Sequence, residues 1–177
     1  THRILTRRNG SVHFDRMQMS ALETGDPVAV LWESESRQWL YVQSSHTEGW
    51  VPSENVAICA REDIARLEEP ADFYITVRAK TPVYHDAAFT DYYGWLPLGS
   101  TIICDEDGGL YLPARDNSGR LEMKVVYIED KYLHRGYLPY TSRNTLTLAF
   151  EMLNLPYGWG GMYGEQDCSA YLMRIFG

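Results

Sequence analysis

A four-residue pattern that occurs twice constrains the fold of this chain more than any other feature. Glycine, an aromatic residue, an aliphatic residue and proline follow one another at residues 49–52 and again at residues 136–139. Before each copy lie short runs of β-branched and aromatic residues, which favour strands, separated by turn-forming residues. The repetition predicts two small β-barrels of the same type, each closing on this pattern.

The first series of predicted strands occupies residues 1–58. Residues 29–32 and 39–42 are strand signals, separated by the polar segment 33–38. A turn at residues 44–49 then leads into the first copy of the pattern. We therefore expect the first barrel over residues 1–58.

The second series occupies residues 73–141, where we expect the second barrel. Strand signals recur here at residues 74–77, 101–104, 110–113 and 123–128. A tyrosine-rich stretch, residues 84–95, is interpreted as an insertion into this barrel.

Between the two series the pattern changes to that of a helix. Ala60, Ile64 and Leu67 are spaced as one face of a helix, with charged residues between them. Pro70 follows and ends the pattern. Residues 59–72 are therefore expected to be a linker helix.

Helical spacing returns after Ser142, which is a candidate N-cap. The apolar residues of this stretch share one helix face and are Leu146, Ala149, Phe150 and Leu153. A further helix is predicted from about Asp167. Because roughly 35 residues are too few for an independent core, residues 142–177 are expected to begin an α+β domain. The predicted fold class is mostly β, followed by the first helices of that domain.

The formal net charge of −8 narrows the range of partners. An acidic surface repels phosphate backbones and anionic lipids, so no nucleic acid partner is expected. No apolar run reaches the ~20 residues of a membrane-spanning helix, so no membrane span is expected.

The chain has three cysteines, Cys59, Cys104 and Cys168, and they do not have the spacing of metal ligands. Their odd number does not indicate a disulfide scaffold. Cys59 and Cys104 have apolar neighbours and are expected to be buried packing residues. Neither a metal nor a cofactor is expected.

Cys168 is the candidate nucleophile. It stands at the predicted start of a helix, where unpaired N–H groups and the helix dipole favour a thiolate. Asp167 can cap this helix with its carboxylate. Gly160 and Gly161 let a substrate carbonyl approach the backbone closely. On these physical grounds alone, a packing role for Cys168 stays open.

The residues around the cysteine follow a longer pattern. Residues 156–161 read Pro-Tyr-Gly-Trp-Gly-Gly and residues 167–170 read Asp-Cys-Ser-Ala. This string resembles the start of the NlpC-family cysteine peptidases, papain-like enzymes of bacterial cell-wall turnover. Residues 40–42 and 49–52 resemble a bacterial SH3-like barrel, and residues 14–22 resemble the first barrel of some cell-wall peptidases. The resemblance implies two SH3-like barrels followed by a papain-like peptidase domain.

The resemblance also implies a role for each residue of the motif. Cys168 would attack the amide that joins the γ-carboxyl of D-glutamate to a diamino acid in peptidoglycan stem peptides. Asp167 and Ser169 would line the substrate subsite, where Asp167 would meet a free α-amine. Tyr157 and Trp159 would shape the loop beside the nucleophile, or would simply pack the two helices together.

In family members with such barrels, the first barrel supplies a wall of the substrate cleft. Trp50, inside the first copy of the repeated pattern, and Glu54, just after it, are the candidates for this wall. For Glu54, a solvated surface charge is the simpler interpretation.

The motif does not supply a general base. The family places a histidine well downstream of the cysteine. All the histidines of this sequence precede Cys168 and are His2, His13, His46, His85 and His134. We therefore expect these residues to be an N-terminal fragment, or one segment, of a longer peptidase. They should be inactive alone, and their partner is the remaining C-terminal part of the peptidase domain.

Three functions remain from this reasoning, and the first two are the main alternatives. The first is a cysteine endopeptidase, a thiol protease that hydrolyses peptidoglycan stem peptides or muropeptides in cell-wall turnover or recycling. The second is a tandem SH3-like module that binds cell-wall peptide without catalysis. The resemblance implies a periplasmic or extracellular location at the cell wall. A signalling role, with the barrels binding Pro-rich peptides, comes third.

Overall fold

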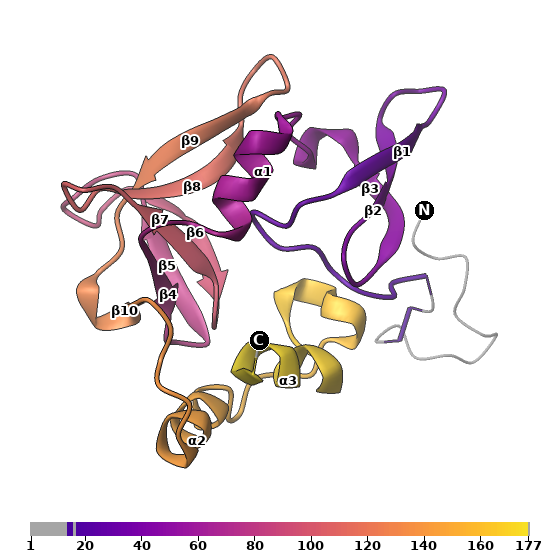
Figure 1. The fold of residues 1–177 in the computed structure, drawn as a ribbon. Helices are drawn as coiled ribbons and strands as arrows, with labels where there is room; N and C mark the ends of the chain where they lie inside the picture. Colours follow the sequence, from indigo (N-terminus) through magenta and orange to yellow (C-terminus); the bar gives the residue numbers. More distant parts are fainter. Residues whose placement is uncertain (1–13, 16, 177) are drawn as a thin grey trace.

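The computed structural model of the chain describes residues 14–15 and 17–176 (Figure 1). Up to Arg135 the regular structure is mostly strands, and α-helices follow from Ser142 onward. The predicted class, mostly β with the first helices of an α+β domain at the end, is confirmed.

The first sheet is an antiparallel meander of three short strands, β1 (Ala29–Glu33), β2 (Trp39–Gln43) and β3 (Glu48–Pro52). Side chains alternate along β2, with Leu40 and Val42 buried and Trp39 exposed on the opposite face. This alternation is what a strand with one buried face requires. The first copy of the repeated pattern lies inside β3, paired along β2, and a short 3₁₀ turn (Ser53–Asn55) follows it.

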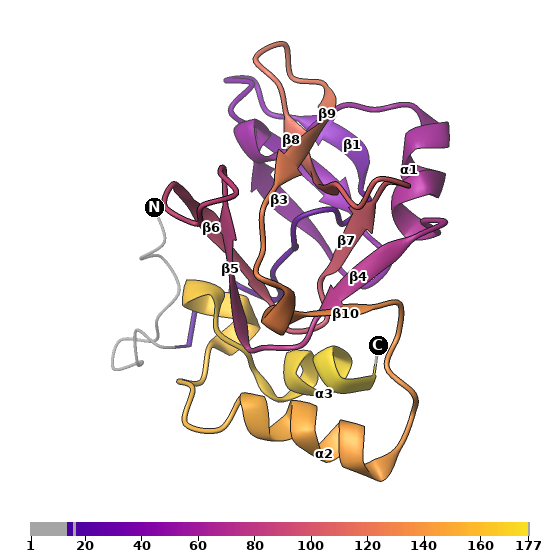
Figure 2. The same cartoon turned by 90° about the vertical axis from the view of Figure 1, so that its left-hand side faces the viewer.

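The predicted linker helix is present as α1 (Arg61–Glu68). The carboxylate of Asp63 accepts a hydrogen bond from the backbone N–H of Ala60 at 3.0 Å, which satisfies one unpaired donor at the helix start. The helix lies beside the second group of strands in both views (Figures 1 and 2).

The second group of strands forms a five-stranded sheet and a separate hairpin. The sheet has the order β10-β4-β7-β8-β9, with the strands β4 (Phe73–Thr76), β7 (Thr101–Cys104), β8 (Leu110–Arg115), β9 (Leu121–Val126) and β10 (Leu133–Arg135). The hairpin pairs β5 (Lys80–Tyr84) with β6 (Tyr92–Pro97). A 3₁₀ turn (Asp130–Tyr132) precedes β10.

One hydrophobic core holds the sheet and the hairpin together. Its buried residues come from both and are Val83, Leu96, Ile102, Leu112, Val126 and Ile128. Because Val83 belongs to β5 and Leu96 to β6, the hairpin is an integral part of this core.

Two details differ from the expectations. The tyrosine-rich stretch 84–95 is not an insertion, because Tyr84 ends β5 and residues 92–95 begin β6. The second copy of the repeated pattern does not lie in a strand, since Gly136 follows β10 with a φ of +65°. Its N–H donates to the carbonyl of Phe73, and the chain then leaves the sheet. The two copies are alike in sequence and different in structure.

The C-terminal helices are α2 (Ser142–Glu151) and α3 (Cys168–Phe176), which pack against each other. Thr141, and not Ser142, is the N-cap of α2, because its side chain accepts from the N–H of Asn144 at 3.2 Å. Figure 2 shows both helices at one end of the molecule, below the strands. None of the helices within residues 14–15 and 17–176 has the length and apolar character needed to cross a membrane.

The predicted apolar stripe of α2 faces solvent in this chain. Large apolar side chains of α2, its C-terminal turn and α3 are more than half exposed, namely Leu146, Phe150, Leu153, Leu172, Met173 and Phe176. These two helices therefore do not build a closed core of their own, in agreement with the small size of this segment.

Candidate active site

The loop that precedes Cys168 has an unusual backbone. Gly160 and Gly161 have φ values of +55° and +78°, a region that L side chains rarely adopt. A Cβ atom added to Gly160 would lie 2.5 Å from the carbonyl oxygen of Gln18, and one added to Gly161 would lie 2.4 Å from the Cβ of Ala21. Both glycines are therefore required by conformation and by close contact with residues 18–21.

Phe14, Asp15 and Gln18 hold this loop from one side. The indole N–H of Trp159 donates to the carbonyl of Asp15 at 2.9 Å, and the side-chain amide of Gln18 donates to the carbonyl of Gly160 at 2.8 Å. The ring of Phe14 packs edge-on against Trp159, with ring centroids 5.5 Å apart. These three residues are thus part of the wall of the site.

The β5–β6 hairpin holds the same loop from a second side. The ammonium of Lys80 pairs with Glu165 at 2.5 Å and also lies 4.9 Å from the ring centroid of Trp95. The ring of Trp95 packs directly against Gly164. The loop between α2 and α3 is therefore fixed by segments that are far apart in the sequence.

Cys168 is the first residue of α3, and its neighbour Asp167 caps the helix. One carboxylate oxygen of Asp167 accepts from the backbone N–H groups of Ser169 (3.1 Å) and Ala170 (2.9 Å) and from the hydroxyl of Ser169 (2.8 Å). The other oxygen accepts from the N–H of Gly160 at 3.2 Å. These bonds, that from Ala170 first, lower the pKa of Asp167. Asp167 thus joins the Gly-rich loop to the helix that carries the cysteine.

Tyr157 lies next to Cys168. Partial burial raises the pKa of the Tyr157 hydroxyl, and the neighbouring Cys168 and Asp167 raise it further, because a second negative charge beside them is unfavourable. A backbone bridge between Tyr157 and Gln166, with the N–H of Gly158 bonded to the carbonyl of Gln166 at 3.1 Å, closes the base of the loop.

The thiol of Cys168 is accessible. The residue is exposed, whereas Cys104 is buried and Cys59 is half-buried, so Cys59 is less enclosed than expected. Burial raises the pKa of both of these other thiols. A cavity of about 330 Å³ lies beside the site and is lined in part by Tyr157, Trp159 and Glu165.

The structure brings together most of the expected site residues, but not all. Tyr157, Trp159, Asp167, Cys168 and Ser169 form one local cluster. Within the described residues, no hydrogen bond or ring contact joins Trp50 or Glu54 to this cluster. Trp50 packs instead against Tyr41 on β2, at 5.3 Å between ring centroids, and Glu54 lies in the 3₁₀ turn after β3.

No described histidine bonds to Cys168. His46 lies in the turn before β3, His85 packs on the ring of Tyr93, and His134 bonds to the carbonyl of Gly136. His2 and His13 fall outside the described residues. Within the described residues, the cluster therefore contains the candidate nucleophile and its helix terminus but no imidazole.

Several contact residues of the site are not predicted by the local motif, among them Asp15, Gln18, Lys80 and Trp95. Only residues 14–22 carry a signal in the sequence, through their resemblance to the first barrel of cell-wall peptidases. The tyrosine-rich stretch before Trp95 gives no such signal.

The chain was compared with known protein families and solved structures. Residues 5–52 match the family model described as an SH3 domain of the SH3b1 type. The fold is similar to that of a solved NlpC/P60 endopeptidase from Photobacterium damselae subsp. piscicida, with a TM-score of 0.76 and 27% sequence identity. The similarity covers 94% of this chain and 36% of that protein, so the chain spans about a third of its length. No curated protein matches the sequence.

These findings confirm the resemblance to NlpC-type cell-wall peptidases with SH3-like barrels. The division of the chain into residues 1–58, 59–72, 73–141 and 142–177 stays a prediction, as do the roles of the individual site residues.

Proposed function

We propose that this chain is part of a cysteine endopeptidase that cleaves the bond between D-glutamate and a diamino acid in peptidoglycan stem peptides. One observation carries the proposal: an exposed cysteine begins α3, directly after a capping aspartate and a Gly-rich loop fixed by Phe14, Asp15 and Gln18. The similarity to an NlpC/P60 endopeptidase supports the same class of reaction. A cell-wall location, in the periplasm or outside the cell, goes with this proposal.

In the proposed reaction, the thiolate of Cys168 attacks the γ-carbonyl carbon of the D-glutamyl residue. The helix N-terminus favours the thiolate, and backbone N–H groups near it can stabilise the oxyanion that forms. The carbon–nitrogen bond then breaks, and the leaving amine takes the proton that a general base had removed from the thiol. Water hydrolyses the thioester and restores the thiol. The proposal requires that base to come from a histidine in the remaining part of the peptidase domain.

For substrate binding, we assign Asp167 and Ser169 to the subsite next to the nucleophile, and Tyr157 and Trp159 to the loop that shapes it. The bonds that Asp167 already accepts support a second role, that of positioning the cysteine. Trp50 and Glu54 remain candidates for a more distant wall of the cleft.

The test is hydrolysis of the tripeptide L-Ala-γ-D-Glu-L-Lys, and of its diaminopimelate counterpart, by the longer protein that carries this chain. Mass spectrometry should show cleavage after D-glutamate, and Cys168→Ala should abolish it. Cys59→Ala, which removes a half-buried thiol outside this cluster, should retain the activity. Cleavage at another bond, or activity that survives Cys168→Ala, would contradict the proposal.

A second candidate is a cell-wall binding module without catalysis. It is favoured by aromatic side chains that line up across the first sheet, where Trp32 pairs with Tyr41 and Tyr41 with Trp50. Trp32 and Trp50 are 67% and 52% exposed, so these rings are available to a ligand. Sedimentation with purified peptidoglycan tests this role in the Cys168→Ala protein, which cannot cleave by the proposed reaction. Adding Trp32→Ala and Trp50→Ala to that protein should move it from the pellet to the supernatant. Unchanged sedimentation would exclude a binding role for this face.

A further inference from the structure

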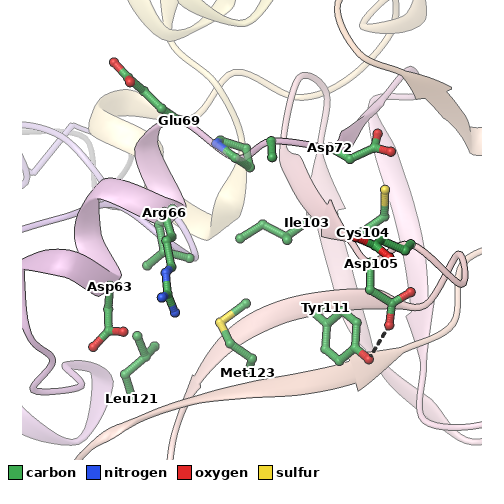
Figure 3. Close-up of a pocket in the computed structure, with 14 residues that line it drawn as sticks. Asp63, Arg66, Glu69, Asp72, Ile103, Cys104, Asp105, Tyr111, Leu121 and Met123 are labelled. Atoms are coloured by element: carbon green, nitrogen blue, oxygen red, sulfur yellow. Dashed lines mark hydrogen bonds between the residues drawn. The ribbon is translucent and has the colours of Figure 1, made fainter.

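A groove that is distant from Cys168 in the sequence belongs to none of the features above. It lies between α1 and the β7-β8-β9 part of the five-stranded sheet and has a volume of about 620 Å³, within the range of pockets that enclose a small ligand (Figure 3). None of its lining residues belongs to the cysteine site or to the aromatic face of the first sheet.

The floor of the groove is apolar. It is formed by residues from α1, from the segment after it and from the strands, namely Leu67, Pro70, Ile103, Leu121 and Met123. Figure 3 shows Ile103, Met123 and Tyr111 in the middle of the groove. Met123 is 40% exposed, so this floor is open to a ligand. An apolar ligand surface would gain free energy by covering it.

The rim of the groove is acidic. Five carboxylates line it, Asp63 and Glu69 on the side of α1 and Asp72, Asp105 and Glu106 on the side of the strands. Figure 3 shows Asp63 and Glu69 across the groove from Asp72 and Asp105. The cation among the lining residues is Arg66.

The carboxylates differ in what already binds them. Asp72 pairs with Arg135, and Asp105 accepts from the hydroxyl of Tyr111 at 2.7 Å and from the N–H of Gly109 at 2.6 Å. These contacts, Arg135 and Tyr111 first, lower the pKa of both aspartates, so both are ionised at neutral pH. Within the described part of the chain, no ion pair involves Glu69 or Glu106.

We propose that this groove binds a short peptide segment that carries a cationic side chain next to apolar residues. The acidic rim matches the cationic side chain of such a segment, which would pair with Glu69 or Glu106. The apolar floor matches the neighbouring side chain, which would cover Met123 and Ile103. A purely apolar ligand would bring these carboxylates into a less polar environment without a partner, which is unfavourable. An anionic ligand is repelled.

The first experiment is a titration of the isotope-labelled chain with the peptide acetyl-Ala-Lys-Leu-Ala-amide, followed by amide chemical shifts. Saturable shifts are expected at Ile103, Tyr111 and Met123, and raising the salt concentration should weaken binding severalfold, because the charges are close to solvent. The matched peptide with Gln in place of Lys should bind about fivefold more weakly or not at all. Equal binding of the two peptides, or no saturable shift, would overturn the proposal.

Charge-reversing variants locate the binding on the chain. Glu69→Lys and Glu106→Lys should each weaken binding of the Lys peptide by about fivefold or more, and Arg66→Gln should strengthen it. Glu122→Lys is the matched control, because Glu122 is an exposed neighbour of Met123 on β9 that does not line the groove. If Glu122→Lys weakens binding as much as Glu106→Lys, the effect is one of net charge, and the proposed site is wrong.

The outcome is independent of the peptidase proposal. Cys168→Ala should leave binding of the Lys peptide unchanged, because Cys168 does not line the groove. Loss of binding in that variant would mean that the peptide occupies the cysteine site instead.

Discussion

At the scale of single residues, the conformation of the loop before Cys168 rests on Gly160 and Gly161. We predict that Gly161→Ala lowers the free energy of unfolding by about 1–3 kcal/mol, because the new methyl group enters a strained φ of +78° and overlaps Ala21. Urea denaturation, followed by tryptophan fluorescence, measures the change.

Gly94→Ala is the matched control. A Cβ atom at Gly94 would meet nothing within 4 Å, and its φ is outside the left-handed region. The free energy of unfolding of this variant should stay within about 0.5 kcal/mol of the parent value. Similar losses in both variants would show that the contact with Ala21 does not stabilise the loop.

The nucleophile and its cap could be predicted from sequence because the signal is local. Asp167, Cys168 and Ser169 are consecutive, and the helix that follows them needs a cap. The contact between Gln18 and Gly160 could not be predicted in the same way, because 142 residues separate its two partners. Only the folded arrangement of the intervening strands brings them together.

At the scale of elements, the start of α3 depends on the charge of Asp167. We predict that Asp167→Asn lowers the free energy of unfolding by about 1 kcal/mol at neutral pH, because an amide is a weaker acceptor for the N–H groups of Ala170 and Gly160. Thermal unfolding of the parent and the variant at a series of pH values measures this difference in stability.

The pH dependence has a definite sign. The pKa of Asp167 is lower in the folded chain than the value of about 3.9 in an unfolded one. The stability that the Asp167 carboxylate contributes is therefore present above about pH 4 and is lost as the pH falls through the folded pKa. The free energies of unfolding of the parent and of Asp167→Asn should therefore converge in acid. Asp130→Asn serves as the control, since no side-chain hydrogen bond to Asp130 is found in the described residues. A difference that persists in acid would contradict the assignment.

The strands show what local patterns can and cannot predict. Residues 29–32, 39–42 and 101–104 are strands as expected, because β-branched and aromatic residues cluster there. The β5–β6 hairpin was missed because Thr81 and Val83 alternate with Pro82, and proline weakens a strand signal. Pro82 is tolerated because this two-stranded sheet leaves it at an edge.

At the scale of the whole molecule, the apolar side chains of α2 and α3 form an exposed surface. Phe150 is 65% and Leu172 is 54% exposed. We predict that this chain self-associates as its concentration rises, because such a surface gains free energy when covered. Phe150→Glu with Leu172→Glu should shift sedimentation velocity profiles toward the monomer without loss of thermal stability.

Val125→Glu is the control for that experiment. Val125 is an apolar residue on β9, 46% exposed, and lies outside the helical surface. An equal shift toward the monomer in this variant would show that added negative charge, and not the loss of the helical surface, disperses the chain. The expectation that residues 142–177 belong to a larger domain agrees with the exposed helices and stays a prediction.

The contact of Asp15 and Gln18 with the Gly-rich loop has a consequence for the order in which the chain folds during synthesis. The residues that fix the loop are made before the loop with Cys168, and 142 residues separate Gln18 from Gly160. Bringing together two residues so far apart in the sequence has an entropic cost. Folding of the intervening strands must first offset this cost. The shape of the loop around the thiol is therefore completed only after the intervening strands have folded, and a nascent chain in which these strands are still unfolded would not yet hold this cysteine in its final setting.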